Sequence, residues 1–129
     1  MKVSKSMWVG WISIPVALFV VIFFATGNGM LEAAGQYDEF AQCLAEEGVT
    51  MYGAYWCPHC MEQKQMFGAS WNHVNYVECS LSNKAGITNA CSDANIKAYP
   101  TWEFQNGLRI EGEIPFEKIS SLSGCKIDQ

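Results

Sequence analysis

The chain has 129 residues and a net charge of −5, and half of its residues are hydrophobic. That length suits one modest domain plus an anchor. The negative charge, without a basic cluster or a phosphate-binding glycine loop, argues against a nucleic-acid surface. Six cysteines in so short a chain are typical of a compartment in which disulfides form.

The first segment predicts a membrane anchor. Residues 1–6 contain Lys2 and Lys5, and residues 7–27 carry no charge. A run of about 20 apolar residues spans the hydrocarbon core of a bilayer. Lysines before the run place the N-terminus in the cytoplasm and the rest of the chain outside, on the periplasmic side. A cleaved signal peptide is the alternative, although its apolar core is usually shorter, about 7–15 residues.

The next stretch predicts the start of a folded domain. Residues 28–35 form a predicted linker, and the domain is predicted over residues 36–129. Apolar residues recur at helical spacing over residues 36–47, and Gly48 is a good stop for that helix. Residues 49–55 are mostly apolar, with β-branched and aromatic side chains, which predicts a buried strand.

The remaining elements are predicted by length and by turn residues. The sequence next predicts a helix over about residues 57–68 and a strand over 74–79. A polar loop is predicted over 80–90, and a short helix or irregular segment over 91–98. Strands over 101–105 and 108–113 flank Asn106–Gly107, a strong signal for a two-residue hairpin. Residues 115–123 predict a last helix. This order predicts an α/β fold, a mixed four-stranded sheet with helices on both faces.

Two cysteines three positions apart lie between a predicted strand and a predicted helix, as in a thioredoxin-like redox motif. Cys57 would cap the helix, where unpaired N–H groups and the helix dipole favour a thiolate, and Cys60 lies about one turn further on. Pro58 suits the first turn, because its missing N–H costs nothing there. His59 can add positive charge beside the thiolate, and Trp56 can shield the disulfide. A lower thiol pKa stabilises the reduced form and makes the pair a better oxidant.

Four further cysteines remain. Cys79 and Cys91 flank the polar loop, and a disulfide closing that loop would contribute about 3 kcal/mol in the chain-entropy model. We favour that structural disulfide over a redox relay or free thiols. Parity suggests that Cys43 and Cys125 also pair, although spacing alone does not show that their geometry allows it.

The order of elements, the Cys57–Cys60 motif and Tyr99-Pro100-Thr101 before the hairpin together resemble the thioredoxin superfamily over about residues 36–125. The chain more specifically resembles the thioredoxin-like domain that accompanies bacterial homologues of vitamin K epoxide reductase. The stretches that carry this resemblance are residues 40–44, 52–60, 63–68, 76–79 and 99–102. In that family the domain is either fused to the quinone-reducing membrane enzyme or encoded as a separate anchored protein.

The resemblance implies that Cys57 is the exposed attacking sulfur and Cys60 the buried resolving one. It implies a cis Pro100, with the backbone of Tyr99, Pro100 and Thr101 binding an extended substrate, and no cofactor. A second cysteine pair lies at similar positions in the resembling family. The implied direction is oxidative, from a quinone-linked, vitamin K epoxide reductase-like membrane partner to secreted or periplasmic proteins with cysteine thiols. The Pro58-His59 dipeptide matches that of the strongly oxidising periplasmic DsbA.

One position departs from the pattern. Many thioredoxin-like proteins carry a buried acid six residues before the first cysteine, where this chain has Met51. Glu62 and Lys64 are near the motif in sequence, but both can be explained as solvated side chains.

Three other functions remain open from the sequence. The same chemistry can run as a reductase or isomerase. A copper-binding or zinc-binding protein could use Cys57, Cys60 and His59, but a structural zinc site needs four ligands and no second C-x-x-C is present. An interaction module without redox activity is the third alternative.

Overall fold

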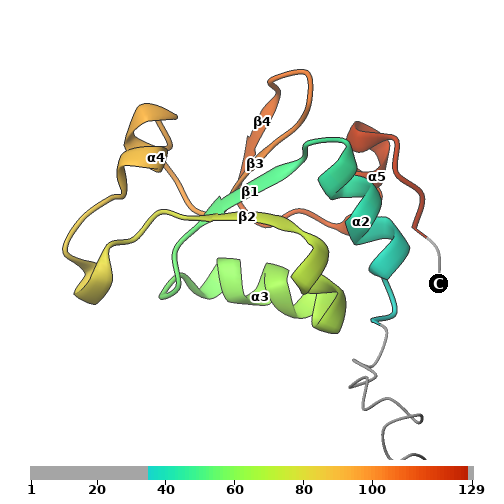
Figure 1. Ribbon diagram of the computed structural model, residues 1–129, viewed down its shortest axis with the longest axis horizontal. Helices are drawn as coiled ribbons and strands as arrows, with labels where there is room; N and C mark the ends of the chain where they lie inside the picture. The colour runs from blue at the N-terminus through green and yellow to red at the C-terminus, as the bar shows by residue number, and fades with distance from the viewer. Residues whose placement is uncertain (1–34, 128–129) are drawn as a thin grey trace, which may run out of the picture. The chain divides into compact units, whose positions relative to one another are not determined.

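The computed structural model of the chain describes residues 35–127 (Figure 1). The predicted anchor at residues 7–27 and nearly all of the predicted linker lie outside these residues. Within residues 35–127, no helix is long and apolar enough to cross a membrane.

The helices and strands follow the predicted order. They are α2 (Asp38–Glu46), β1 (Thr50–Gly53), α3 (Pro58–Phe67), β2 (Asn75–Glu78), α4 (Asn89–Asp93), β3 (Thr101–Glu103), β4 (Arg109–Glu111) and α5 (Phe116–Ser123). Two 3-10 helices, η1 (Gly68–His73) and η2 (Ser82–Lys84), were not predicted from the sequence. The strands are shorter than predicted, since apolar residues continue beyond the paired part of each strand.

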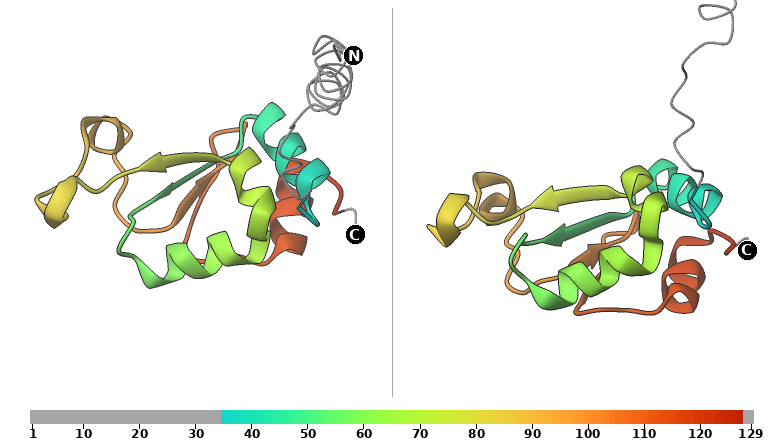
Figure 2. Two further views of the ribbon diagram at one scale, coloured as in Figure 1. Left: turned by 60° about the horizontal axis from the view of Figure 1, so that its bottom comes forward. Right: turned by 90° about the horizontal axis from the view of Figure 1, so that it is seen from below.

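The four strands form a mixed sheet in the order β2-β1-β3-β4. Strand β1 pairs in parallel with β2 and antiparallel with β3, and β3 pairs antiparallel with β4. Helix α3 runs along the sheet, α2 and α5 lie near one end of it, and α4 lies near the other (Figures 1 and 2). This architecture fits an α/β thioredoxin-like fold.

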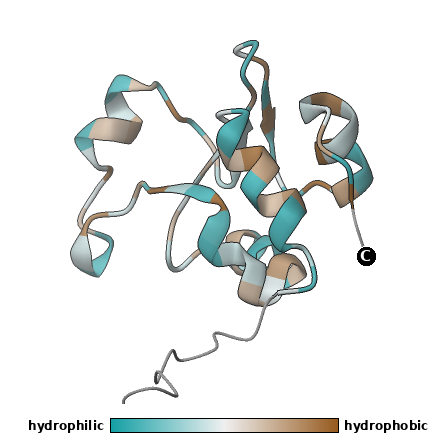
Figure 3. Ribbon diagram, turned by 45° about the vertical axis from the view of Figure 1, so that its right-hand side comes forward, coloured by the Kyte–Doolittle hydropathy of each residue, from teal (hydrophilic) through white to brown (hydrophobic). Residues whose placement is uncertain are grey.

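Aromatic side chains form the main core. The ring of Phe67, at the end of α3, lies 4.6 Å from the ring of Phe116 and 6.1 Å from that of Phe40, measured between centroids. Trp102 is fully buried beside them. The helices carry both hydrophobic and hydrophilic residues (Figure 3), and α2 buries Phe40, Ala41 and Leu44 on one face.

The β3–β4 hairpin differs from its prediction by one residue. The N–H of Gly107 donates to the carbonyl of Phe104 at 2.8 Å, so the centre of the turn is Gln105–Asn106. Gly107 then takes a left-handed conformation with φ of 78°, which gives a three-residue loop. The side chain of Asn106 accepts a hydrogen bond from the N–H of Leu108, which favours this longer loop. The predicted two-residue turn at Asn106–Gly107 is therefore wrong.

Candidate active site

The two motif cysteines begin helix α3. Cys57 is its N-cap, and the Cys57 sulfur accepts a hydrogen bond from the N–H of Cys60 at 3.2 Å. Pro58 occupies the first helical turn, as its missing N–H allows. Both cysteines are free thiols in the structure, with exposed fractions of 5% for Cys57 and 0% for Cys60. The two sulfurs are therefore unequal, because only Cys57 has any access to solvent.

The environment of Cys60 disfavours its ionised form. Burial raises the pKa of the Cys60 thiol to about 12, and the hydrogen bond with Cys57 acts in the same direction. The positive charge of Lys64 acts in the opposite direction. At neutral pH Cys60 is therefore a protonated thiol, and it must lose or gain a proton in any exchange reaction.

Trp56 forms part of the rim of the site. Its side chain is 39% exposed, and its indole N–H donates to the hydroxyl of Ser80 at 2.8 Å. The ring meets that of Tyr99 edge to face at 6.2 Å, and the ammonium of Lys84 lies 5.5 Å from its centre. Trp56 thus connects the motif to the loop after β2 and to the segment before β3.

The predicted substrate-binding segment directly precedes β3. The Tyr99–Pro100 peptide bond is cis, and Pro100 is buried. The hydroxyl of Thr101 donates to the carbonyl of Ala98 at 2.7 Å. Burial raises the pKa of Tyr99, and the negative charges of Glu78 and Cys60 raise it further, so Tyr99 lies within electrostatic reach of the buried thiol.

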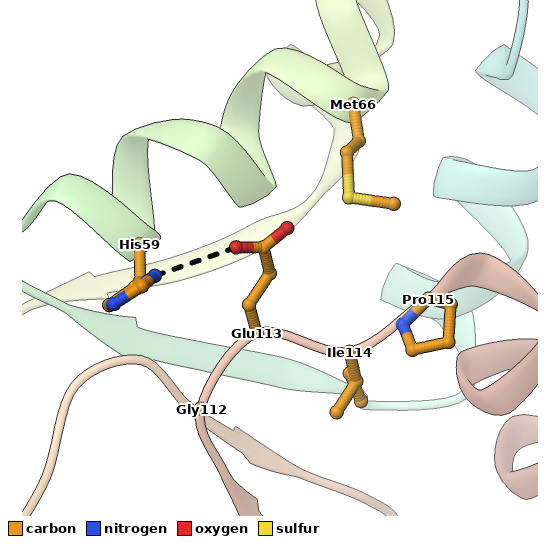
Figure 4. Close-up of a pocket in the computed structure, with 6 residues that line it drawn as sticks. All are labelled: His59, Met66, Gly112, Glu113, Ile114 and Pro115. Atoms are coloured by element: carbon orange, nitrogen blue, oxygen red, sulfur yellow. Dashed lines mark ion pairs between the residues drawn. The ribbon is translucent and has the colours of Figure 1, made fainter.

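The imidazole of His59 faces two carboxylates. Its Nδ1 atom lies 3.3 Å from a carboxylate oxygen of Glu62 and 3.6 Å from one of Glu113, and its side chain is 67% exposed. Figure 4 shows the imidazole pointing toward Glu113. Both residues border a hollow with a volume of about 510 Å³. The hollow is lined by His59, Met66, Gly112, Glu113, Ile114 and Pro115.

Metal-donor side chains converge only here within residues 35–127. The donor atoms of His59, Glu62 and Glu113 all lie within 4.8 Å of one another, and all three residues are exposed. Neither motif thiol belongs to this group. The combination of Cys57, Cys60 and His59, which the sequence left open as a copper or zinc set, does not converge in the structure.

Several residues of the site were not singled out from the sequence, and Gln63 is one of them. Gln63 is fully buried, and its side-chain oxygen accepts from the Trp102 indole at 3.3 Å and from the N–H of Ile114 at 2.9 Å. Its side-chain nitrogen donates to the carbonyl of Ile114 at 3.1 Å. Gln63 lies three residues after Cys60, on the same helix face, and that spacing is the signal that could have revealed it. Another is Glu78, at the end of β2.

The four remaining cysteines form two disulfides. Cys79 is joined to Cys91, which lies 12 residues further along the chain, and their Cα atoms are 5.4 Å apart. Cys43 of α2 is joined to Cys125, 82 residues away, with a Cα–Cα distance of 5.8 Å. These four cysteines are therefore separate from the free pair at the start of α3.

The chain is similar to a curated plant protein. No family model matches it. It is 40% identical over 106 residues to "Thiol-disulfide oxidoreductase LTO1" of Arabidopsis thaliana. The match covers 76% of this chain but 28% of the plant protein, so the chain spans less than a third of that relative. This similarity, together with two free thiols at a helix start in a thioredoxin-like fold, supports an oxidoreductase enzyme.

Proposed function

We propose that the chain is a thiol–disulfide oxidoreductase that uses Cys57 and Cys60. The observation that carries this proposal is the inequality of the two thiols, one at a helix N-cap with access to solvent and one fully buried. A substrate thiolate attacks Cys57 of the oxidised pair, and a mixed disulfide forms while Cys60 leaves. A second substrate thiol then releases the reduced enzyme.

The proposed direction is oxidative. The chain donates disulfides to secreted or periplasmic proteins, and a quinone-linked, vitamin K epoxide reductase-like membrane partner reoxidises it. A single helix over residues 7–27 anchors it, with the domain outside the cytoplasm. Support comes from the family resemblance, from the Pro58-His59 dipeptide and from the two further disulfides, which suit an oxidising compartment.

The proposed substrate surface surrounds Cys57. Trp56 and Tyr55 provide exposed aromatic area beside it, and Tyr99, Pro100 and Thr101 provide the backbone for an extended segment. Pro58 and His59 tune the pair. The hydrogen bond from the N–H of Cys60 stabilises negative charge on the Cys57 sulfur.

The first experiment is the reduction potential of the Cys57–Cys60 pair in the full-length chain, measured against glutathione. A value near about −120 mV, as in DsbA, is expected for a disulfide donor. A value near about −270 mV, as in thioredoxin, would instead indicate a reductase.

A trapping experiment tests the roles of the two cysteines. Cys60→Ser should accumulate a mixed disulfide on Cys57 when mixed with a substrate protein whose cysteines carry glutathione mixed disulfides, because Cys57 attacks the substrate sulfur and glutathione leaves. Cys57→Ser should trap nothing and should show no activity. Equal activity of Cys57→Ser and the unchanged chain would exclude the proposed function.

A further inference from the structure

The buried thiol of Cys60 has no acid beside it at the usual strand position. Met51 is fully buried there, opposite Tyr76 of β2 and Trp102 of β3. Each exchange reaction nevertheless moves a proton to or from Cys60, because its pKa is far above neutrality. With no exposed surface, Cys60 cannot exchange that proton directly with bulk water. Another group must carry it.

A tyrosine hydroxyl and the Cys60 sulfur both lie beside Gly53. Gly53 separates the two: a methyl group on Gly53 would lie 3.0 Å from the sulfur of Cys60 and 3.3 Å from the hydroxyl oxygen of Tyr76. Since Gly53 has no side chain, the sulfur and the hydroxyl both border the space that a side chain would fill. The pKa of Tyr76 is raised by burial, by Glu78 and by the charges of Cys60 and Cys57, as expected for this proximity.

The hydroxyl of Tyr76 leads to a carboxylate. It donates to Oε2 of Glu78 at 2.8 Å. The other carboxylate oxygen, Oε1, accepts from the backbone N–H groups of Tyr55 at 3.2 Å and Ser80 at 2.9 Å. These donors fix the carboxylate between the segment before Cys57 and the loop after β2. Glu78 is half-buried, so it can exchange a proton with solvent where Cys60 cannot.

The other charged or titratable groups near Cys60 are less suitable. Glu62 is mostly exposed and faces His59. Lys64 is a cation, which lies 3.6 Å from the centre of the Tyr76 ring and stabilises negative charge on Cys60 without accepting its proton. Tyr99 has no carboxylate hydrogen-bonded to it in the described structure, and Cys57 is the reaction partner itself.

We propose that Glu78, acting through the hydroxyl of Tyr76, accepts the proton of Cys60 and returns it in the reverse direction. The inference rests on the proposed function. When Cys60 attacks the sulfur of Cys57 in a mixed disulfide, the Cys57–Cys60 bond forms and the bound thiol leaves as a thiolate. The Cys60 proton passes to the Tyr76 oxygen through one water, as the Tyr76 proton passes to Glu78. In disulfide donation the same protons return to Cys60 as it leaves Cys57.

The lifetime of a mixed disulfide tests this relay. The reduced full-length chain is mixed with oxidised glutathione, and the Cys57–glutathione adduct is followed by rapid acid quenching and mass spectrometry from pH 6 to pH 9. Glu78→Gln and Tyr76→Phe should lengthen the lifetime of the adduct at pH 7 by about 100-fold, since general base catalysis contributes about 10²–10⁴-fold. In both variants the rate should rise tenfold with each pH unit, because hydroxide replaces the lost base.

Glu117→Gln is the matched control, because it removes an exposed carboxylate from α5, outside the site. It should behave like the unchanged chain. Variants that keep the unchanged rate and pH profile would overturn the relay. So would an unchanged chain whose own rate rises tenfold per pH unit, which needs no variant to fold. A chain that forms no adduct on Cys57 would contradict the proposed function instead.

Discussion

The two ends of the sheet are held together in different ways. At the end with α2 and α5, the rings of Phe40, Phe67 and Phe116 pack against one another, and the Cys43–Cys125 disulfide adds to an extensive core. At the end with η2 and α4, the fully packed cluster consists of Cys79, Cys91 and Ile96.

The redox thiols belong to the larger core, but the rim of their site contacts the end with the smaller core. Ser80, the residue that follows Cys79, accepts a hydrogen bond from the Trp56 indole through its hydroxyl and donates one to Glu78 through its backbone N–H. Beside the active site, the Cys79–Cys91 disulfide therefore stabilises the end of the sheet with the smaller core. At the opposite end, packed aromatic rings stabilise the fold. Two structural disulfides in one domain can thus stabilise it for different reasons.

The largest effect is expected from the long-range disulfide. Replacing Cys43 and Cys125 together by alanine opens a loop with a sequence separation of 82 residues. The free energy of unfolding should fall by about 4 to 5 kcal/mol, because the unfolded chain regains the entropy of that loop. Urea unfolding with the redox pair oxidised measures it. A loss smaller than that of the Cys79–Cys91 double variant would contradict this dependence on loop length.

Removing the short-range disulfide should lower the free energy of unfolding by less but should increase the local opening of α4 by more. With a separation of 12 residues, replacing Cys79 and Cys91 by alanine should cost about 3 kcal/mol. The small cluster there cannot order α4 alone, so amide hydrogen exchange should accelerate more in α4 than in α5. Equal protection of α4 in the variant and the unchanged chain would show that packing holds both ends.

The free thiols should make the free energy of unfolding depend on pH, whereas the disulfides should not. The folded-state pKa of Cys60 is about 12, above the 9.0 of an ordinary thiol, so the pH has no effect through Cys60 while both states remain protonated. Between these values the unfolded state releases the proton and the folded state keeps it. The free energy of unfolding of the reduced protein should therefore fall, by about 1.4 kcal/mol one unit above pH 9.0.

The oxidised protein is the control for this pH effect, because it has no thiol at position 60. Tyr76 also has a raised pKa and lowers stability above pH 10.0 in the same direction, but it does so in both redox forms. The difference between the reduced and oxidised unfolding curves removes the contribution of Tyr76 and leaves that of the two motif thiols, including the buried Cys60. Parallel curves up to about pH 11, still below the folded-state pKa of this thiol, would contradict its buried, protonated state.

The smallest effect is expected at the contact between the site and the loop after β2. Ser80→Ala removes the acceptor of the Trp56 indole N–H and should cost about 1 kcal/mol, typical of one hydrogen bond. The fluorescence of Trp56 should shift to the red as the ring becomes more exposed. Ser121→Ala, which removes a bond between an exposed serine and the carbonyl of Lys118, serves as the control and should leave the spectrum unchanged.

Local sequence signals predicted much of the fold. Cys57 caps α3 and Gly124 ends α5 with φ of 80°, because capping and left-handed turns depend on neighbouring residues. The hairpin was misplaced by one residue, since Asn106 can stabilise either of two turns. Helix η1 was not predicted, because a 3-10 segment of six residues has no strong periodicity.

The site was predictable only in part. The C-x-x-C spacing identified both thiols, but the partners of those thiols come from other strands and loops. Gly53, Tyr76 and Glu78 meet only once β1 and β2 are paired. His59 faces Glu113, far along the chain, rather than Cys57 alone. Contacts of this kind depend on tertiary packing, which single-sequence patterns do not encode.

Gln63 also sets the order in which the site can be completed during synthesis. Its backbone partner, Ile114, lies 51 residues further along the chain. Chains emerge from the ribosome N-terminus first, at about 5–20 residues per second, so Cys57 and Cys60 appear seconds before Ile114 does. A chain stalled before that point would carry both redox cysteines without the hydrogen bonds that hold their helix, so the redox pair matures only after residue 114 has been added.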